Sequence, residues 1–282
     1  MTFKIVPTGF AAGAEICGVN LAKPIGSNLL ATIDRALAKH GVIFFRDQDL
    51  TPDQQISVTQ RLGNLDPNTF GETHGLDGYP GIVIISNVLE DGFEIGVKAA
   101  GENWHSDMCY TPKPPRGTIL YAQEVPEQDG LILGDTCFAA CNTAYKALPE
   151  SMKQRLDGVR ATFDFAGRKR HTPITKEQVE RFPPVSHPVV RTHPVTGEKC
   201  LYVMRDDCTG IEGVEGGEAG RMIAALADHI IRPEFVYRHQ WRQADLLIWD
   251  NCTVQHKAIQ DYALPSRRLM HRTTFAAKSV PM

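Results

Sequence analysis

Short hydrophobic runs, rich in β-branched and aromatic residues, dominate the chain from position 82 onward and are separated by Gly, Pro and Asp. Together with an earlier run at 42–45, these runs are predicted as strands over 82–86, 117–122, 189–193, 201–203, 235–239, 245–249 and 268–274. Many short strands with turn residues between them are typical of a β-sandwich or a jelly roll.

Helices are predicted where apolar positions recur at helical spacing. One helix is predicted over Ala31–His40, ending at Gly41, and a second is predicted to begin at Thr51, with Pro52 in its first position. The glycine-rich stretch 210–220 is predicted as a flexible connection, because it lacks P-loop and Rossmann spacing. Helical insertions between the strands are predicted at 139–148, 150–156 and 221–231. The predicted fold class is therefore mainly β with helical insertions, an α+β arrangement.

Length, composition and charge narrow the class of protein. With 282 residues, 42% of them hydrophobic, and no repeat or linker, the chain is predicted to form a single domain over 1–282. Its net charge of −3 gives no long-range attraction to nucleic acid or a membrane surface, so a small-molecule partner is expected. No apolar run is long enough for a signal peptide or a membrane span, which makes a cytoplasmic location the expectation. The seven cysteines contain no Cys-x-x-Cys pair and fit neither a disulfide scaffold nor a structural zinc site.

Two histidines and one aspartate are the candidate metal ligands. His105 and Asp107 are two positions apart, so in an extended segment both side chains point to the same side and can converge on one ion. Alone this pair is a weak signal, since His-x-Asp also occurs in surface turns. His256 follows the predicted strand 245–249 and a turn, where a lone histidine is more often a satisfied core residue. Together, the three match the two imidazoles and one carboxylate with which non-haem iron(II) oxygenases hold their metal.

Several motifs, in one order along the chain, carry a resemblance to a known family: Asn103-Trp-His-Ser-Asp107, Leu133-Gly-Asp-Thr136, His187-Pro-Val-Val-Arg-Thr-His-Pro194, Trp249-Asp-Asn251 with His256, and Arg267-Arg-Leu-Met-His-Arg272. In these motifs the chain resembles, over almost its whole length, the TauD/TfdA family of iron(II)- and 2-oxoglutarate-dependent dioxygenases. The resemblance implies a double-stranded β-helix core, the jelly roll of cupin-like proteins. It implies iron(II) as cofactor, 2-oxoglutarate and O2 as co-substrates, and His105, Asp107 and His256 as the catalytic metal ligands.

The resemblance also implies residues that bind the co-substrate and the substrate. 2-Oxoglutarate chelates iron through its keto oxygen and the adjacent carboxylate, so its distal carboxylate needs a separate cationic anchor. By resemblance this anchor is Arg268, whose planar guanidinium can donate two parallel hydrogen bonds, assisted by the hydroxyl of Thr136. Arg272 lies four residues further on, and strand periodicity places it on the same face. In relatives the matching arginine binds an anionic group of the primary substrate; the alternative is that Arg272 reinforces the 2-oxoglutarate site.

Other positions depart from the pattern of the taurine enzymes. Asn68 and Phe70 stand nearest to the places of a taurine-binding histidine and tyrosine, and Gly101 replaces an asparagine, so taurine itself is disfavoured. Asp207 stands where an aromatic residue would line the pocket. It could hold a cationic group of the substrate if it faces the cavity, or it could lie in an exposed loop. Phe165 is expected to form an apolar wall of the substrate pocket.

The predicted reaction is hydroxylation of a small, anionic organic substrate, such as a sulfonate or a carboxylate, with release of succinate and CO2. Because O2 must react only after the substrate has arrived, mobile lids are expected, and residues 66–81 and 165–185 are the candidates. Two alternatives remain open: a non-catalytic protein that binds or senses a small molecule on the same scaffold, and a zinc-dependent hydrolase with Glu102 as the only nearby base. A homo-oligomer, a dimer or a tetramer, is expected from the family and from symmetry.

Overall fold

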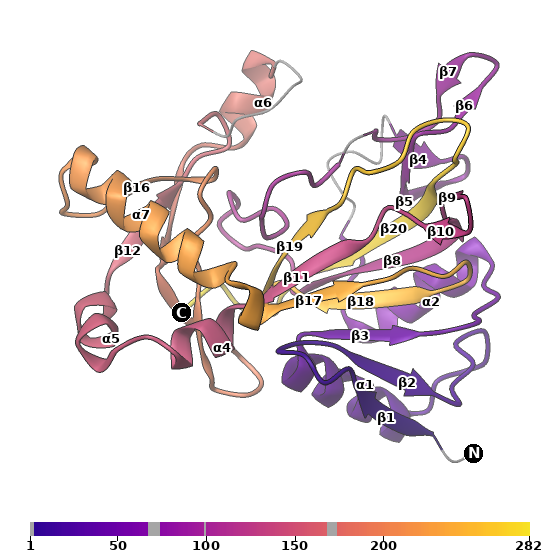
Figure 1. Cartoon of the computed structure of the whole chain (residues 1–282), viewed down its shortest axis with the longest axis horizontal. Coiled ribbons are helices and arrows are strands. Elements are labelled where there is room, and N and C mark those ends of the chain that lie inside the picture. Colours follow the sequence, from indigo (N-terminus) through magenta and orange to yellow (C-terminus); the bar gives the residue numbers. More distant parts are fainter. Residues whose placement is uncertain (1–2, 67–73, 99, 168–173) are drawn as a thin grey trace.

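The structure is a computed structural model that describes residues 3–66, 74–98, 100–167 and 174–282. Within these residues, the largest element is an eight-stranded sheet (Figure 1). In spatial order its strands are β1 (Lys4–Pro7), β2 (Ala14–Cys17), β3 (Val42–Phe45), β18 (Leu246–Asp250), β8 (Gly117–Glu124), β20 (Leu269–Phe275), β5 (Tyr79–Ser86) and β4 (Gly75–Leu76). Its central neighbours β3, β18, β8, β20 and β5 are antiparallel to one another.

Alternate side chains of this large sheet pack into two different layers. On β18, Leu246 and Ile248 share a buried cluster with residues of α1 (Ser27–His40) and α2 (Pro52–Leu62). Leu247 and Trp249 belong instead to the cluster on the opposite face. Successive residues of a strand point to opposite faces, so this strand, buried on both sides, reads as a continuous hydrophobic run.

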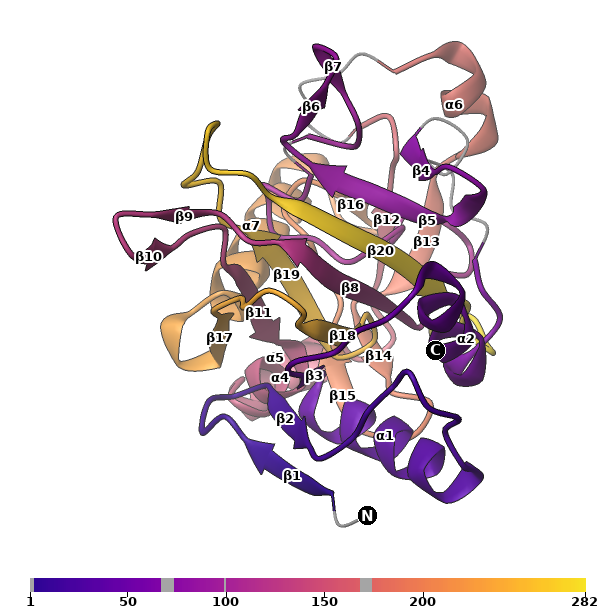
Figure 2. The same ribbon diagram turned by 90° about the vertical axis from the view of Figure 1, so that its right-hand side faces the viewer.

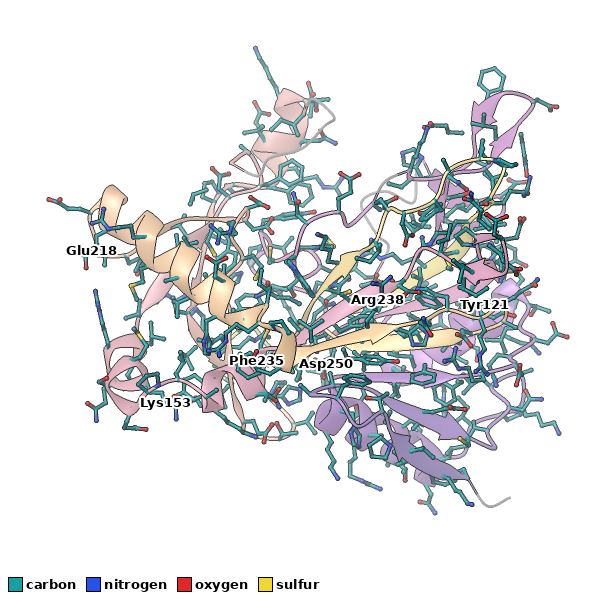
Figure 3. All side chains as sticks on the ribbon, in the orientation of Figure 1. Tyr121, Lys153, Glu218, Phe235, Arg238 and Asp250 are labelled. Atoms are coloured by element: carbon teal, nitrogen blue, oxygen red, sulfur yellow. The ribbon has the colours of Figure 1, made fainter. Side chains whose placement is uncertain are left out.

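The opposite face is covered by a three-stranded sheet in the order β17 (Val236–His239), β11 (Thr136–Ala140) and β19 (Val254–Ala258). Phe138 of β11 is fully buried between the two sheets, with its ring centroid 5.8 Å from that of Trp249 and 6.1 Å from that of His256. Figure 3 shows side chains filling this interior. The candidate metal ligand His256 therefore lies on β19, which pairs with β11, and its ring packs against the buried core.

A third cluster surrounds α7 (Gly216–Ile230) and lies beside the two facing sheets, on the left of Figure 1. Figure 2 shows the same elements from the side. The remaining elements are β6 (Leu89–Glu90), β7 (Phe93–Glu94), β9 (Glu127–Gln128), β10 (Leu131–Ile132), α4 (Cys141–Lys146), α5 (Glu150–Leu156), β12 (Arg160–Phe163), α6 (Lys176–Arg181), β13 (Val185–Pro188), β14 (Val190–Thr192), β15 (Lys199–Leu201), β16 (Cys208–Ile211) and η1 (Pro233–Phe235).

The predicted class, strand-rich with helical insertions, is confirmed, and several boundaries follow the predicted signals. Helix α1 ends at His40, and Gly41 after it has φ of 69°, a backbone conformation that glycine adopts without steric cost. Thr51 caps α2 in a capping box with Gln54, with Pro52 as the first helical residue. Helix α5 spans the predicted residues 150–156.

Two predictions about local structure were wrong, and in both cases tertiary packing decides. The predicted helix 139–148 begins only at Cys141, because Ala139 and Ala140 pair with strands β17 and β19 as the end of β11. The stretch 210–220 is not a flexible connection. It contains the end of β16 and the first turn of α7, where Ala219 already packs into the third cluster and offsets the low helix propensity of glycine.

The other predicted strands and helices are present, and their observed bounds differ from the predicted bounds by a few residues. The strands predicted at 189–193 and 201–203 are found as β14 and β15.

The two candidate lids remain predictions. The lid 165–185 contains α6, capped by Thr175, and its residues 168–173 lie outside the described part. Residues 67–73 of the lid 66–81 also lie outside the described part. None of the seven cysteines, which all lie in the described part, forms a disulfide bond. In the described ranges, no helix has the length and apolar content needed to cross a bilayer.

Candidate active site

The backbone brings the two candidate histidines face to face. His105 and His256 form an antiparallel bridge in which the N–H of each donates to the carbonyl of the other, at 3.1 and 2.9 Å. Residues opposite each other in such a pair place their side chains on the same face. The two imidazole ring centroids are consequently 4.1 Å apart.

Asp107 completes the group from two positions beyond His105. Its Oδ1 lies 3.8 Å from the Nε2 of His105 and 3.8 Å from the Nε2 of His256. All three ligand atoms lie within 4.8 Å of one another, and all three residues are buried. Two bonds of about 2 Å to one ion allow ligand atoms to lie up to roughly 4 Å apart, so the two 3.8 Å separations fit a shared metal.

Hydrogen bonds to neighbouring groups orient the ligand atoms of His105 and Asp107. The Nδ1 of His105 lies 2.8 Å from the carbonyl of Asn103, which can only accept, so Nδ1 carries the proton and Nε2 keeps its lone pair for a metal. Thr118 on β8 donates to Oδ2 of Asp107 at 2.6 Å. This bond turns the other oxygen, Oδ1, toward the two imidazoles. The donor set therefore fits a divalent metal held by two imidazoles and one carboxylate.

Arg272 dominates the electrostatics around Asp107, with its Nη2 2.9 Å from Oδ1. Burial alone would raise the pKa of Asp107. The Arg272 guanidinium, the two imidazoles and the hydroxyl of Thr118 outweigh burial and hold this pKa well below its ordinary value. Asp107 is thus a carboxylate, the form that binds metal, throughout the physiological pH range.

Arg268 lies just before β20 and is 3% exposed. In the described part of the chain no carboxylate pairs with it and its Nε has no hydrogen-bond partner; its guanidinium carbon lies 5.7 Å from the ring centroid of Tyr262. Burial lowers the pKa of Arg268, since removal from water disfavours the charged form. A buried guanidinium without a counter-ion is costly, so a bound anion would relieve that cost.

One pocket joins these groups, with an empty volume of about 460 Å³ that includes space open to solvent. Both arginines predicted on one face of a strand, Arg268 and Arg272, line it. The described residues of its wall are Ile85, Ala100, Gly101, His105, Asp107, Leu120, Thr136, Trp249, His256, Ala258, Arg268 and Arg272. Metal-type ligands, two cations and an apolar wall therefore converge on one cavity, which is the arrangement of a small-molecule site.

Four residues predicted to contact the substrate are not part of the described pocket wall. Asn68 and Phe70 lie outside the described residues. Phe165 packs against Tyr110 in the cluster around α7, with ring centroids 4.8 Å apart. Asp207 is 1% exposed, so the alternative of an exposed loop carboxylate was wrong. A role of these four residues in substrate binding stays a prediction.

Sequence reasoning did not predict the site roles of Thr118, which donates to Asp107, and of Gly101, which lies in the pocket wall. Thr118 gives no local signal, because its contact with Asp107 arises only when β8 packs behind the metal ligands. Gly101 was seen only as a departure from the family pattern. It has φ of 80°, and a Cβ built there would lie 3.2 Å from Cε1 of His105, so the position needs glycine both for its backbone and for space. A glycine close before a His-x-Asp motif was the available signal.

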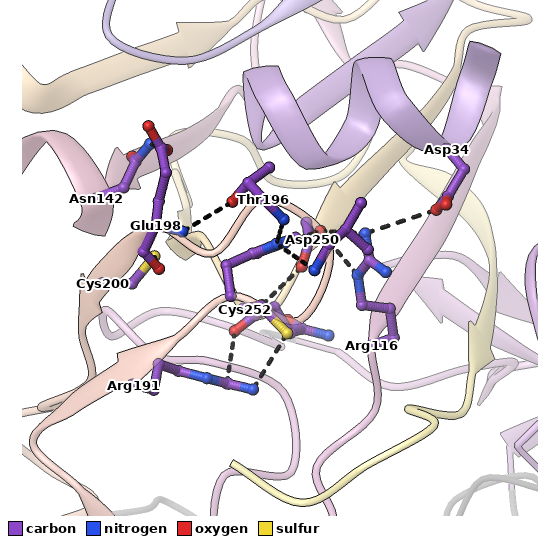
Figure 4. Close-up of polar contacts among 12 residues, drawn as sticks. Asp34, Arg116, Asn142, Arg191, Thr196, Glu198, Cys200, Asp250 and Cys252 are labelled. Atoms are coloured by element: carbon purple, nitrogen blue, oxygen red, sulfur yellow. Dashed lines mark hydrogen bonds and ion pairs between the residues drawn. The ribbon is translucent and has the colours of Figure 1, made fainter. Parts of the chain in front are cut away.

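His193, Asp250 and Cys252 form a second group of metal-type side chains, and Figure 4 shows Asp250 and Cys252 with their polar contacts. Its ligand atoms are already used: Asp250 accepts hydrogen bonds from Arg116 at 2.8 Å, from His193 at 3.0 Å and from the N–H of Cys252 at 2.8 Å. The thiol of Cys252 accepts from the guanidinium of Arg191 at 3.1 Å. The positively charged guanidinium groups of Arg116 and Arg191 are thus in contact with these ligand atoms and repel a metal cation. The group is an ion-pair network that fixes the turn between β18 and β19.

The pocket combines a set of metal-type ligands with two arginines, and comparison with known proteins supplies the family. Residues 3–274 match the family described as "Taurine catabolism dioxygenase TauD, TfdA family". The chain is 33% identical to the alpha-ketoglutarate-dependent 2,4-dichlorophenoxyacetate dioxygenase of Cupriavidus pinatubonensis (strain JMP 134 / LMG 1197), over 94% of each chain. It is 31% identical to the alpha-ketoglutarate-dependent sulfate ester dioxygenase of Pseudomonas putida, over 99% of this chain and 91% of the relative.

A solved structure is also similar to this chain over its whole length. The crystal structure of AAD-2 in complex with Mn(II) and N-oxalylglycine superimposes with a TM-score of 0.84 and 27% identity, covering 100% of both chains. The chain therefore belongs to the TauD/TfdA family of dioxygenases.

Replacement of Asp250 by Asn tests the ion-pair network. Burial would raise the pKa of Asp250, but Arg116 and His193 outweigh burial and hold it well below its ordinary value of 3.8. A carboxylate whose pKa is lowered by folding stabilises the fold above that ordinary value and loses this contribution as the pH falls below it. At pH 7, Asp250→Asn should therefore lower the free energy of unfolding by roughly 3–5 kcal/mol in urea titrations.

Asp228→Asn is the matched control, because Asp228 pairs with Arg205 on the exposed surface. It should change the free energy of unfolding by at most about 1 kcal/mol. Equal losses from both variants would contradict the role assigned to Asp250.

Replacement of Gly101 by Ala tests the packing of the metal site. The new Cβ crowds His105 and should weaken binding of Mn(II), measured by calorimetry, roughly tenfold. Gly92→Ala is the control, since Gly92 has a similar φ of 85° but no atom within 4 Å of a built Cβ. If Gly92→Ala weakened Mn(II) binding as much, crowding of His105 would not be the cause.

Proposed function

We propose that His105, Asp107 and His256 hold iron(II), and that Arg268 with Thr136 holds the distal carboxylate of 2-oxoglutarate. The observation that carries this proposal is one pocket lined both by the three converging ligands and by a buried arginine that no carboxylate pairs with among the described residues. The donor chemistry supports iron: two neutral imidazoles and one carboxylate on one side leave positions for a chelating co-substrate.

The protein is an iron(II)- and 2-oxoglutarate-dependent dioxygenase, as are the relatives that match almost its whole length. When bound, iron(II) with 2-oxoglutarate and O2 supplies the oxidation of a substrate C–H bond, while the co-substrate is converted to succinate and CO2. The residues of the chain position the reactants. Ile85, Leu120 and Trp249 form an apolar wall that limits water beside the ligands, and Arg268 balances the charge of a dianionic co-substrate.

The primary substrate is proposed to carry an anionic group that Arg272 recognises. Arg272 lines the pocket beside the metal ligands, and the named relatives act on 2,4-dichlorophenoxyacetate and on a sulfate ester, which are both anions. In the described structure Arg272 pairs with Asp107, so a role in supporting the metal and 2-oxoglutarate side of the pocket is the second candidate. Taurine remains disfavoured, because Gly101 has no side chain to take the place of the asparagine of the taurine enzymes.

The two other functional classes have less support. A zinc-dependent hydrolase needs a base beside the metal, and Glu102 is not among the described residues of the pocket wall. A binding or sensing protein would be expected to lack a metal ligand or the anchoring arginine, and this chain keeps them all.

We also propose the core architecture, the domain organisation, the location, the partner and the oligomeric state of the protein. The core is a double-stranded β-helix, supported by the facing sheets of β18 and β11, and residues 1–282 form a single domain. The location is cytoplasmic, and the partner is a small molecule without nucleic acid or membrane. A homo-oligomer, a dimer or a tetramer, is proposed on grounds of symmetry.

The reaction is tested with a panel of aryloxy acids, sulfate esters and sulfonates, supplied with iron(II), 2-oxoglutarate and air. We expect succinate and O2 consumption above the substrate-free background for at least one compound. Arg272→Met should raise the KM of that compound at least about tenfold, since a charge-assisted contact is lost. Full activity of Arg272→Met would remove the argument for substrate recognition, and no succinate with any compound would favour the binding protein.

The co-substrate anchor is tested by comparing two adjacent arginines. Arg268→Met should weaken 2-oxoglutarate binding in the presence of Mn(II) by about 10²-fold or more, because one partner of a buried ion pair is lost. Arg267→Met removes the same charge from an exposed position, where Arg267 pairs with Glu124, and should leave the Kd within about twofold. Similar affinities in both variants would contradict the assignment of Arg268.

A further inference from the structure

The hydroxyl of Thr136 receives a hydrogen bond from a residue behind the pocket. The indole Nε1–H of Trp241 donates to Oγ1 of Thr136 at 3.0 Å. Thr136 lines the pocket, whereas Trp241 is 1% exposed and is not part of the described pocket wall. An indole N–H can only donate, so the oxygen of Thr136 must accept, and its own hydrogen is left to point elsewhere.

Among the described residues, no acceptor is found for that hydrogen. The backbone of Thr136 is used by the strand pairs of β11 with His239 on one side and Ala258 on the other. Within the described residues the bond from Trp241 is the one hydrogen bond found for this hydroxyl. A buried hydroxyl that has accepted from an indole lowers its energy by donating to an acceptor in the cavity.

We propose that Trp241 is a positioning residue that makes Thr136 an obligatory hydrogen-bond donor toward the distal carboxylate of 2-oxoglutarate. This inference rests on the proposed function. A carboxylate offers only acceptors, so it needs a donor at this point, and Arg268 supplies the remaining donors from the same wall. Without the indole the hydroxyl could rotate and present a lone pair to the carboxylate, which would weaken the contact.

The surroundings of Trp241 hold the indole in one orientation. The ring of His239 meets it edge to face, with centroids 4.7 Å apart and an interplanar angle of 83°. His239 is itself fixed on both sides, by Tyr237 at 2.8 Å from Nδ1 and by Asp245 at 3.3 Å from Nε2. Asp245 in turn pairs with Arg46. Because these groups are packed and hydrogen-bonded, the N–H is directed at Thr136 before any ligand arrives.

The test is 2-oxoglutarate binding to the full chain with Mn(II), measured by calorimetry without turnover. Trp241→Phe should raise the Kd of 2-oxoglutarate roughly 5- to 50-fold, the range expected for weakening one hydrogen bond to a charged group. The Kd of Mn(II) alone should stay within about twofold, because Trp241 does not reach the metal ligands. Phe44→Leu is the control. It perturbs the same cluster and the same histidine, with ring centroids 4.8 Å apart, and should leave both constants unchanged.

A double-mutant cycle separates positioning from general packing. Thr136→Val removes the hydroxyl, so adding Trp241→Phe should then weaken binding by less than about twofold, whereas Thr136→Ser should keep the full effect of Trp241→Phe. If Trp241→Phe fails to fold, Trp241 is replaced by β-(3-benzothienyl)alanine, which keeps the fused rings and lacks the N–H.

Two outcomes would overturn the inference in different ways. Wild-type affinity in Trp241→Phe or in the benzothienyl protein, or an undiminished loss in the Thr136→Val background, refutes the role of Trp241 alone. If the unaltered protein binds no 2-oxoglutarate with Mn(II), the proposed function fails and the inference fails with it.

Discussion

The exchange of two backbone hydrogen bonds between His105 and His256 is the interaction on which the candidate site depends. Side chains alone could not hold two imidazoles 4.1 Å apart between distant parts of the chain. The backbone pair does so before a metal arrives, so the entropy of bringing the ligands together belongs to folding rather than to metal binding. His256 lies on β19 beside β11, and Asp250 fixes the turn where β19 begins. The pairing thus transmits the rigidity of the sheets to the site.

Charge is the second constraint on this pocket. Among the described residues of its wall, the carboxylate of Asp107 shares the pocket with two arginines, Arg268 and Arg272, and Arg272 already pairs with it. A divalent metal adds further positive charge at the same point. Anions bound inside such a pocket would stabilise it, which agrees with the proposed dicarboxylate co-substrate and anionic substrate. Trp241 refines this preference, because it decides whether Thr136 offers a donor or an acceptor.

Most strands and the three candidate metal ligands were predicted from the sequence, whereas the contacts that depend on tertiary packing were not. The strands and His105, Asp107 and His256 were predicted from short-range pattern and from motif order. Two contacts depend on how the sheets pack and cannot be predicted from a local sequence pattern. They are the hydrogen bond of Thr118 to Asp107 and the hydrogen bond between Trp241 and Thr136. Helix α7 begins inside a glycine-rich stretch for a similar reason, since burial of its apolar face outweighs propensity.

The central claim is that one metal ion binds between His105, Asp107 and His256, with the distal carboxylate of the co-substrate against Arg268 and Thr136. A crystal structure of this protein with Mn(II) and N-oxalylglycine measures it most directly. We expect Mn(II) within about 2.3 Å of both Nε2 atoms and of Oδ1 of Asp107, and a ligand carboxylate within hydrogen-bond distance of the guanidinium of Arg268 and the hydroxyl of Thr136. Mn(II) bound at His193 and Asp250 instead, or a carboxylate directed away from Arg268, would contradict it.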